Sequence, residues 1–449
     1  EEVFSPRSIA VVGVSGSGRN FASGVLVALK EAGFPRVYPV NPRHAEVLGV
    51  TCYPGLLAIP DVVDHVVVSI PAESVLALLD ECATKGVRSV HFFTAGFSES
   101  GEAERARLEQ AMLEKARQGG FRILGPNCIG MAVPARRVTN TPGIPLEPGP
   151  VAFISQSGGH ASNLPQYGGP RGLRFSKIVS YGNGLDIDES ELLEYLATDP
   201  ATGIIAVYIE GVRDGRRFRT ALEKAAAVKP VVIYKGGTTG AGQRAAHGHT
   251  ASLTSSVAVF QALCHQAGAI LTDDFEELLD VVVALRFVRP VPASTGVAIV
   301  GAGGGPSVLA SDEVEKAGLA MPQTTPAVRA ELMRALPLAG SIFANPIDAP
   351  NLATPEAITA TVQVLSRVPE IGAFIYHLGF HPISSWGGGR FAQPSFLQPV
   401  TTGLKQVWQT SGKPVLMALR PGLNLEEMKD FLAVQEAPVS YTHLTLPTN

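Results

Sequence analysis

The sequence predicts an α/β protein made of three doubly wound domains, in which a mainly parallel sheet carries helices on both faces. Short β-branched runs alternate with longer stretches whose apolar residues recur at helical spacing. This alternation starts again three times, each time from a strand that ends in glycine or serine. The strands are almost purely apolar, which indicates that both faces of each sheet are buried. A length of 449 residues suits about three domains.

The first domain is expected over residues 1–140. Its strands are predicted at residues 9–13, 37–40, 65–70, 89–93 and 122–124. Between the third and fourth of these, Val75, Leu79 and Cys82 recur at helical spacing, which predicts a helix. A proline-rich link at residues 141–150 ends the domain.

The second domain is expected over residues 151–289 and the third over residues 293–438, with a proline link between them. Their strands are predicted at residues 151–155, 203–209 and 231–234, and at residues 296–301, 373–376 and 414–418. Residues 439–449 break the pattern and read like the translated end of a sequencing transposon. We therefore expect a non-native tail there and a third domain that is cut short.

The composition excludes several classes of function. Hydrophobic residues make up 45% of the chain and the net charge is −4, so no basic surface for nucleic acid or an anionic membrane is expected. The first residues lack the features of a signal peptide, and no apolar run approaches the roughly 20 residues that span a bilayer. The 4 cysteines show no metal-ligand spacing. We expect a soluble, cytoplasmic protein without a metal site.

A glycine-rich turn follows the first strand and precedes a helix expected over residues 22–32. Its residues include Gly13, Ser15, Gly16, Ser17 and Gly18. Glycines at this place let backbone N–H groups approach a phosphate, although a tight turn without a ligand is the simpler alternative. An NAD site would need an acidic residue after the next strand, whereas Asn41, Pro42, Arg43 and His44 stand there. A basic residue suits a phosphorylated ribose, and CoA meets that demand.

A second turn of this kind opens the second domain. It consists of Ser155, Gln156, Ser157 and Gly158, followed by Gly159 and His160. Hydroxyl groups and free N–H groups at the start of a helix indicate an anion site, and plain N-capping is the alternative.

Two histidines, His247 and His249, lie in a loop of small residues after the strand near residue 234. Metal binding would need further ligands, and no carboxylate or cysteine lies nearby in the sequence. A histidine can instead act as a nucleophile, which requires one free ring nitrogen and an acceptor that holds the other. Glu210, at the end of a buried strand, is a candidate holder, and a solvated loop glutamate is the alternative.

Taken together, these segments resemble the NDP-forming acyl-CoA synthetase family, which includes the ADP-forming acetyl-CoA synthetases and, more distantly, the α subunit of succinyl-CoA synthetase. The matching segments keep the order and spacing of the family; they include residues 39–42, 94–99, 124–130, 155–158, 182–189, 209–216, 249–253, 302–306 and 345–348. The resemblance implies an N-terminal Rossmann-like CoA-binding domain followed by two flavodoxin-like doubly wound domains.

The resemblance implies an acid–CoA ligase that makes acyl-CoA from a carboxylic acid, CoA and NTP through an acyl phosphate and a phosphohistidine relay. It assigns the phosphohistidine to His249 and its orientation to Glu210, while one spacing argument leaves His247 open. The implied phosphate cradle is Ser155, Ser157 and Gly158. The implied CoA contacts are Gly13, Ser15, Gly16, Ser17, Gly18, Asn41, Arg43, Thr94, Ala95 and Gly96.

The sequence contains no glycine-rich ATP-grasp segment. We therefore expect ATP or GTP with Mg²⁺ to bind to an ATP-grasp β subunit or fused domain. Other expected partners are a small carboxylic acid and further subunits of an oligomer. The chain departs from the family pattern at Thr238, where the family often has arginine, at residues 255–257, and at Gly159-His160, where Ala-Leu is usual.

Two other classes of protein stay open. One is a catalytically inactive acyl-CoA-sensing module of a fused protein acetyltransferase, which would have no need for His249 and Glu210. The other is a nicotinamide-dependent oxidoreductase, which would leave the His249 segment without a role.

Overall fold

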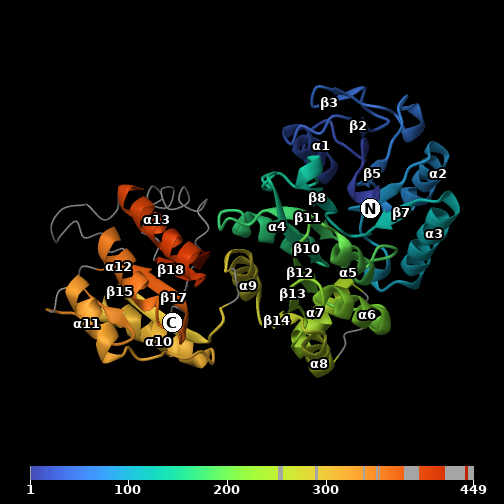
Figure 1. Cartoon of the computed structure of the whole chain (residues 1–449). Helices are drawn as coiled ribbons and strands as arrows, with labels where there is room; N and C mark the ends of the chain where they lie inside the picture. The colour runs from blue at the N-terminus through green and yellow to red at the C-terminus, as the bar shows by residue number, and fades with distance from the viewer. Residues whose placement is uncertain are drawn as a thin grey trace. The chain divides into compact units, whose positions relative to one another are not determined.

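The computed structural model describes residues 2–250, 256–288, 292–336, 339–349, 352, 354–378, 394–419 and 440–442 (Figure 1). They fall into two compact units. The first comprises Glu1–Gly169 and Leu173–Val282, and the second Pro170–Gly172 and Val283–Asn449. In the described residues, the first unit contains two large sheets and the small two-stranded sheet β3-β4, and the second unit contains one large sheet, so the α/β class that the sequence predicts is confirmed.

The N-terminal sheet of the first unit is parallel and has the strand order β2-β1-β5-β6-β7. Its strands are β1 (Ile9–Val12), β2 (Val37–Val40), β5 (His65–Val68), β6 (Ser89–Phe92) and β7 (Arg122–Leu124). Its helices are α1 (Phe21–Glu31), α2 (Val75–Lys85) and α3 (Ala103–Gly119). Short elements complete the domain: η1 (Glu2–Phe4), β3 (Glu46–Val47), β4 (Val50–Thr51), η2 (Leu56–Ala58), η3 (Ala72–Ser74), η4 (Ser98–Ser100) and η5 (Pro134–Arg136).

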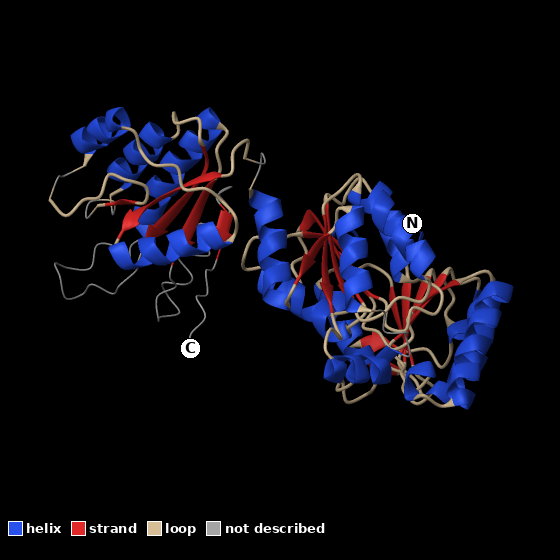
Figure 2. Cartoon of the chain, turned by 90° about the horizontal axis from the view of Figure 1, so that it is seen from below, coloured by secondary structure: helices blue, strands red, loops and turns tan. Residues whose placement is uncertain are grey.

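Both faces of this sheet are buried, as the apolar strands predict. Ile9 and Val11 belong to one core with α1, whereas Ala10 and Val12 belong to another with α2 and α3. Side chains alternate between the faces of a strand, so each face needs its own helices. Figure 2 shows helices on both sides of the strands.

The second sheet has the strand order β14-β13-β12-β10-β11-β8-β9, and its pairings are parallel except for those of β8 with β11 and with β9. Its strands are β8 (Met131–Val133), β9 (Val138–Thr139), β10 (Pro148–Ser155), β11 (Phe175–Ser180), β12 (Ile204–Ile209), β13 (Val231–Lys235) and β14 (Ile270–Thr272). Its helices are α4 (Gly158–Gly168), α5 (Glu189–Thr198), α6 (Gly215–Ala226), α7 (Gly240–Thr250), α8 (Val257–Ala267) and α9 (Phe275–Phe287). The antiparallel strands β8 and β9, which the alternation did not predict, come from residues before the proline-rich link.

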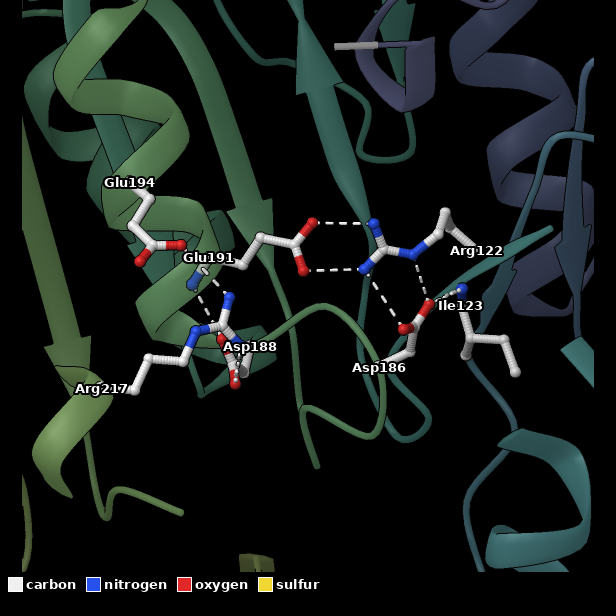
Figure 3. A network of polar contacts seen from close by, with 7 residues as sticks. All are labelled: Arg122, Ile123, Asp186, Asp188, Glu191, Glu194 and Arg217. Atoms are coloured by element: carbon white, nitrogen blue, oxygen red, sulfur yellow. Dashed lines mark hydrogen bonds and ion pairs between the residues drawn. The ribbon is translucent and has the colours of Figure 1, made fainter. Parts of the chain in front are cut away.

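Arg122 ties the two sheets of the first unit together (Figure 3). From β7 it donates to Asp186 (2.8 and 3.2 Å) and to Glu191 (2.8 and 2.7 Å). Asp186 also accepts the backbone N–H of Ile123 at 2.8 Å. Paired hydrogen bonds of this kind fix direction as well as distance. The start of β7 is therefore held against the segment that joins β11 to α5 within this unit.

The sheet of the second unit is parallel, with the strand order β16-β15-β17-β18-β19. Its strands are β15 (Gly296–Ala302), β16 (Ile347–Asp348), β17 (Ile371–Leu378), β18 (Val415–Leu419) and β19 (Ser440–Thr442). Its helices are α10 (Gly304–Lys316), α11 (Pro326–Ala335), α12 (Pro355–Leu365) and α13 (Pro394–Ser411). Strand β19 comes from the segment that the sequence predicts to be a tail. Within the described ranges, no helix is both long and apolar enough to cross a bilayer.

Candidate active site

The glycine-rich turn lies at the carboxyl edge of the N-terminal sheet, directly after β1. Gly13 has a φ of +95°, and a Cβ atom there would lie 2.1 Å from the carbonyl oxygen of Ser69, so only glycine fits. Asn20 caps α1 by accepting the N–H of Ser23 at 3.0 Å, and its amide donates to the Gly13 carbonyl oxygen at 2.7 Å. The turn is therefore held against the start of α1, where helix N–H groups favour an anion.

Ser15, Gly16, Ser17 and Gly18 form the outer part of this turn. The hydroxyl groups of Ser15 and Ser17 lie 2.8 Å apart, and the Gly16 N–H donates to His44 Nε2 at 3.3 Å. Gly16 and Ser17 are exposed, so their polar groups are accessible to a ligand. The His44 side chain therefore also contacts this turn. The sequence indicated this only through the position of His44 after β2.

Asn41 positions the turn that carries Arg43. The Asn41 amide donates to the Val14 carbonyl oxygen at 2.7 Å, and its Oδ1 accepts the N–H of Arg43 at 2.8 Å. The Asn41 side chain therefore joins the turns that follow β1 and β2. The Arg43 side chain is exposed and presents its charge at the same edge.

Thr94, Ala95 and Gly96 follow β6. The Thr94 hydroxyl donates to the Ile70 carbonyl oxygen at 2.8 Å, and the Gly96 N–H donates to Glu99 Oε1 at 2.6 Å. These internal bonds shape the turn, and Ala95 is its exposed residue. The carboxyl ends of parallel strands share one edge of a sheet. The turns that follow β1, β2 and β6, which contain the predicted CoA contacts, therefore lie at the same edge. The strand order reverses beside β1, which is where such sheets bind ligands.

The second predicted turn follows β10 and starts α4. Ser157 is the N-cap of α4, because its Oγ accepts the N–H of His160 at 3.4 Å. Ser155 Oγ donates to the Ser157 carbonyl oxygen at 2.6 Å. N-capping is therefore present, but a single cap satisfies only part of the N–H groups that a helix start leaves without an intrahelical acceptor. The N–H groups at the start of α4 that the cap does not satisfy could still bind an anion.

Gln156 joins this turn to the segment that carries Glu210. Its Oε1 accepts the N–H of Glu210 at 2.7 Å and that of Gly211 at 3.1 Å. Strands β10 and β12 are neighbours in the sheet, which brings the two segments together. The sequence prediction did not single out Gln156, because nothing local to the motif indicates this distant partner.

Glu210 is only 8% exposed, which excludes the solvated loop glutamate. The Tyr208 hydroxyl donates to Glu210 Oε1 at 3.1 Å. Burial raises the pKa of Tyr208, and the neighbouring Glu210 charge raises it further, so the phenol stays a donor. Lys235 Nζ donates to the carbonyl oxygens of Glu210 (2.6 Å) and Gly236 (2.5 Å). The Glu210 backbone and one carboxylate oxygen are thereby fixed.

His247 and His249 lie in α7, so the expectation of a loop at this place was wrong up to Thr250. Alanines at residues 245 and 246 favour a helix, but the glycines of the segment oppose it, so local propensity alone does not decide the structure. The side chains of residues 246–250, and all of residues 251–255, lie outside the described part of the chain. The backbone of α7 lies against η4 of the N-terminal domain.

Two of the positions that depart from the family pattern have defined surroundings. The ring of His160 lies 4.3 Å from that of Tyr208 and 4.6 Å from that of Phe275, so it belongs to an aromatic cluster behind the α4 turn. Burial lowers the pKa of His160. Thr238 lines a cavity of about 210 Å³ together with residues that include Lys235 and Phe260.

Comparisons with known proteins match both halves of the first unit. A family model described as "CoA binding domain" matches residues 7–134, and one described as "Succinyl-CoA ligase like flavodoxin domain" matches residues 148–285. The sheets built from β1 and from β10 correspond to these two matches.

Relatives extend the similarity to the second unit. The alpha subunit of the ADP-forming acetate–CoA ligase II of Pyrococcus furiosus is 35% identical over 435 residues, which cover 97% of this chain and 93% of that protein. The ADP-forming 4-hydroxybutyrate–CoA ligase of Nitrosopumilus maritimus is 32% identical, and the match covers 83% of this chain and 54% of that protein. This chain thus spans about half the length of the second relative.

Solved structures also resemble nearly the whole chain. One of them is the dinucleotide-forming acetyl-coenzyme A synthetase 1 of Ca. Korarchaeum cryptofilum in complex with phosphate and ADP. The TM-score is 0.83 at 31% sequence identity, and the match covers 98% of this chain and 93% of that one.

Proposed function

The chain belongs to the alpha-subunit family of ADP-forming acyl-CoA synthetases, and on that premise we propose that it joins a small carboxylic acid to CoA through a phosphohistidine at His249. Its N-terminal domain is a CoA-binding domain. The observation that carries the proposal is that Gln156 Oε1 accepts the backbone N–H groups of Glu210 and Gly211, because this joins the turn before α4, the proposed anion site, to the residue that bears a buried carboxylate.

The proposed reaction has three steps. An imidazole nitrogen of His249 attacks the terminal phosphorus of NTP, a P–N bond forms, and NDP leaves. The carboxylate of the acid then takes the phosphoryl group, which gives an acyl phosphate and free histidine. Finally, the CoA sulfur attacks the acyl carbon, a C–S bond forms, and phosphate leaves.

Glu210 and the α4 turn have separate roles in this proposal. Glu210, fixed by Tyr208 and Gln156, accepts the N–H of one ring nitrogen of His249, which leaves the lone pair of the other nitrogen for phosphorus. Ser155, Ser157 and Gly158 cradle the phosphoryl group, whose charge the start of α4 stabilises. A buried carboxylate held in this way has no use in an acyl-CoA sensor, which favours the ligase.

CoA is proposed to bind along the carboxyl edge of the N-terminal sheet. The turn from Gly13 to Gly18 offers N–H and hydroxyl groups, and Arg43 offers a charge for a CoA phosphate. Asn41, Thr94 and Gly96 shape the neighbouring turns, and Ala95 lies at their surface.

The nucleotide is proposed to bind elsewhere, as ATP or GTP with Mg²⁺ on an ATP-grasp β subunit or fused domain. The acid is proposed to be small, since relatives are named for acetate and 4-hydroxybutyrate. We further propose an oligomer that works in the cytoplasm, because the buried free cysteines Cys52, Cys82, Cys128 and Cys264 suit a reducing compartment.

Phosphorylation of the histidine tests the proposal directly. With an ATP-grasp partner and γ-labelled nucleotide, the chain should become labelled, and His249→Asn should abolish the label. The matched control is His247→Asn, which should keep it. Label that survives in His249→Asn but disappears in His247→Asn would assign the phosphoryl group to the other histidine, and no label in the unaltered chain would reject the relay.

A further inference from the structure

Glu109 is a buried carboxylate at a point where three separate segments meet. It lies on α3 and is 3% exposed. Its Oε2 accepts the N–H of Ser98 (3.0 Å), the hydroxyl of Ser98 (2.6 Å) and the amide of Asn183 (3.0 Å). Its Oε1 accepts a guanidinium N–H of Arg213 at 3.2 Å. One carboxylate group thus receives donors from both sheets of the first unit.

Each of the three segments leads to a part of the proposed active site. Ser98 starts η4, two residues after the Thr94–Gly96 turn that we assign to CoA. Asn183 lies in the loop after β11. Arg213 lies in the loop after β12, the same loop that begins with Glu210. Glu109 therefore stands between the CoA turn and the residue that is proposed to hold the phosphohistidine.

A second set of bonds runs parallel to the first. The Asn183 amide also donates to Glu99 Oε2 at 2.7 Å, and Glu99 Oε1 accepts the N–H of Gly96 at 2.6 Å. Glu99 thus connects Gly96 of the CoA turn to Asn183, which also donates to Glu109. In addition, the backbone of α7, which carries His249, lies against η4.

The physical reason to expect coupling is the cost of a buried charge. A carboxylate away from water is tolerated only while its donors stay in place, so a shift of one donor segment favours a shift of the others. Arg213 supplies the positive charge of an ion pair with Glu109. A change in the position of the CoA turn should therefore change the position of the segment that carries Glu210, and the reverse should hold as well.

We propose that Glu109 is a positioning residue that couples CoA binding at the Thr94–Gly96 turn to the state of the phosphohistidine near Glu210. This rests on the proposed function. Coupling between two binding events is reciprocal, so phosphorylation of the histidine changes the affinity for CoA by the factor by which CoA changes the phosphorylation equilibrium. The affinity of CoA for the two forms of the enzyme measures this factor.

The experiment uses the chain with its ATP-grasp partner and without the carboxylic acid, so that CoA binds but no acyl-CoA forms. Calorimetry gives the Kd of CoA for the phosphorylated and unphosphorylated enzyme. In the unaltered enzyme we expect the two values to differ by roughly 5- to 150-fold. In Glu109→Gln the ratio should fall close to one, while γ-labelled nucleotide still labels His249. A merely structural role would lower stability without changing this ratio.

Three further variants make the result decisive. Arg213→Gln acts from the more exposed side of the ion pair, so it tests the idea even if Glu109→Gln folds poorly, and it should also lower the ratio. The double variant Glu109→Gln with Arg213→Gln should lower the ratio no further than Glu109→Gln alone, because both changes remove the same ion pair. Glu191→Gln is the matched control: it removes one of the two ion pairs of Arg122, which also join the two domains of the first unit, and should leave the ratio unchanged.

The outcomes separate the two proposals. An enzyme that is never labelled at His249 refutes the phosphohistidine relay. An enzyme that is labelled but shows equal CoA affinities in both forms refutes the coupling alone. A ratio in Glu109→Gln and Arg213→Gln as large as in the unaltered enzyme also refutes the role of Glu109.

Discussion

At the scale of single residues, the polar side chains of the candidate site bond mostly to the backbone of neighbouring turns. Asn41 bonds to Val14 and Arg43, the Thr94 hydroxyl bonds to Ile70, and Gln156 bonds to the segment of Glu210. These side chains set the shape of the turns. We therefore expect backbone N–H groups and a few exposed side chains, among them Arg43, to contact the ligand.

Arg43 is the residue at which this division of roles can be tested. Replacement of Arg43 by alanine should weaken CoA binding roughly fivefold at low salt, since an exposed ion pair contributes up to about 1 kcal/mol. The difference should shrink as salt is added, because salt screens exposed charges. Calorimetric titration with CoA measures both effects. The matched control is Arg36→Ala, which removes an exposed arginine at the opposite end of β2. Equal affinities for the two variants would remove Arg43 from the site.

The sequence alone predicted the residue types at the site but not their partners. The motifs placed Ser157 and Glu210 after β10 and β12, which are neighbours in the second sheet, and Arg43 after β2 of the N-terminal sheet. The sequence did not predict that Thr94 and Asn41 use their polar groups internally. The bond of Gln156 to Glu210 spans 54 positions, so it depends on which strands are neighbours, and no local pattern carries that information.

At the scale of elements, α4 and α7 differ in how well the sequence predicted them. The start of α4 carries an N-cap residue and two glycines, which is a strong local signal. The segment of α7 is rich in glycine and small residues, which predicted a loop, whereas its backbone is helical up to Thr250. The helix propensity of this segment is weak. Its helix is stabilised by contact with η4, which is distant in the sequence and therefore does not enter a local prediction.

The start of α4 permits a test that separates helix capping from phosphate binding. Asp and Asn cap helices as well as Ser does, so Ser157→Asp and Ser157→Asn should both keep the thermal stability of the chain. The aspartate adds a negative charge beside the phosphoryl group, and two unit charges about 4 Å apart repel by about 4 kcal/mol at an effective dielectric constant of 20. Labelling of His249 should therefore fall at least about 100-fold in Ser157→Asp and persist in Ser157→Asn. Equal labelling of both variants would leave Ser157 as a cap alone.

At the scale of the whole molecule, the first unit depends on polar contacts between its two sheets. Arg122 bonds to Asp186 and Glu191, which lie 64 and 69 positions away, and Glu109 bonds to Arg213, 104 positions away. The alternation of strands and helices predicted both sheets, because it is a local pattern. The contacts that hold the sheets together depend on the arrangement of whole domains and had to be seen in the structure.

Two histidines in the core of the N-terminal sheet make the stability of this unit depend on pH. His65 and His91 are 0% exposed, and their rings stack with a centroid distance of 6.5 Å. Burial lowers the pKa of His65 to about 3 and that of His91 to about 4. In an unfolded chain the pKa of histidine is about 6.5. The folded protein therefore keeps both rings neutral at pH values where an unfolded chain already binds protons.

The sign of the pH effect follows from these pKa values. Their contribution to stability is fully present above about pH 6.5 and is lost as the pH falls from there towards about 4 for His91 and about 3 for His65, because protons bind first to the unfolded chain. Each histidine should add a slope of up to about 1.4 kcal/mol per pH unit to the free energy of unfolding, measured by urea titration. His65→Gln can still bond to Ser89, which His65 contacts at 2.8 Å, and should make the slope shallower. The exposed His265→Gln controls for the loss of a histidine; slopes that are equal in the two variants would show that the buried rings are not the source of the acid sensitivity.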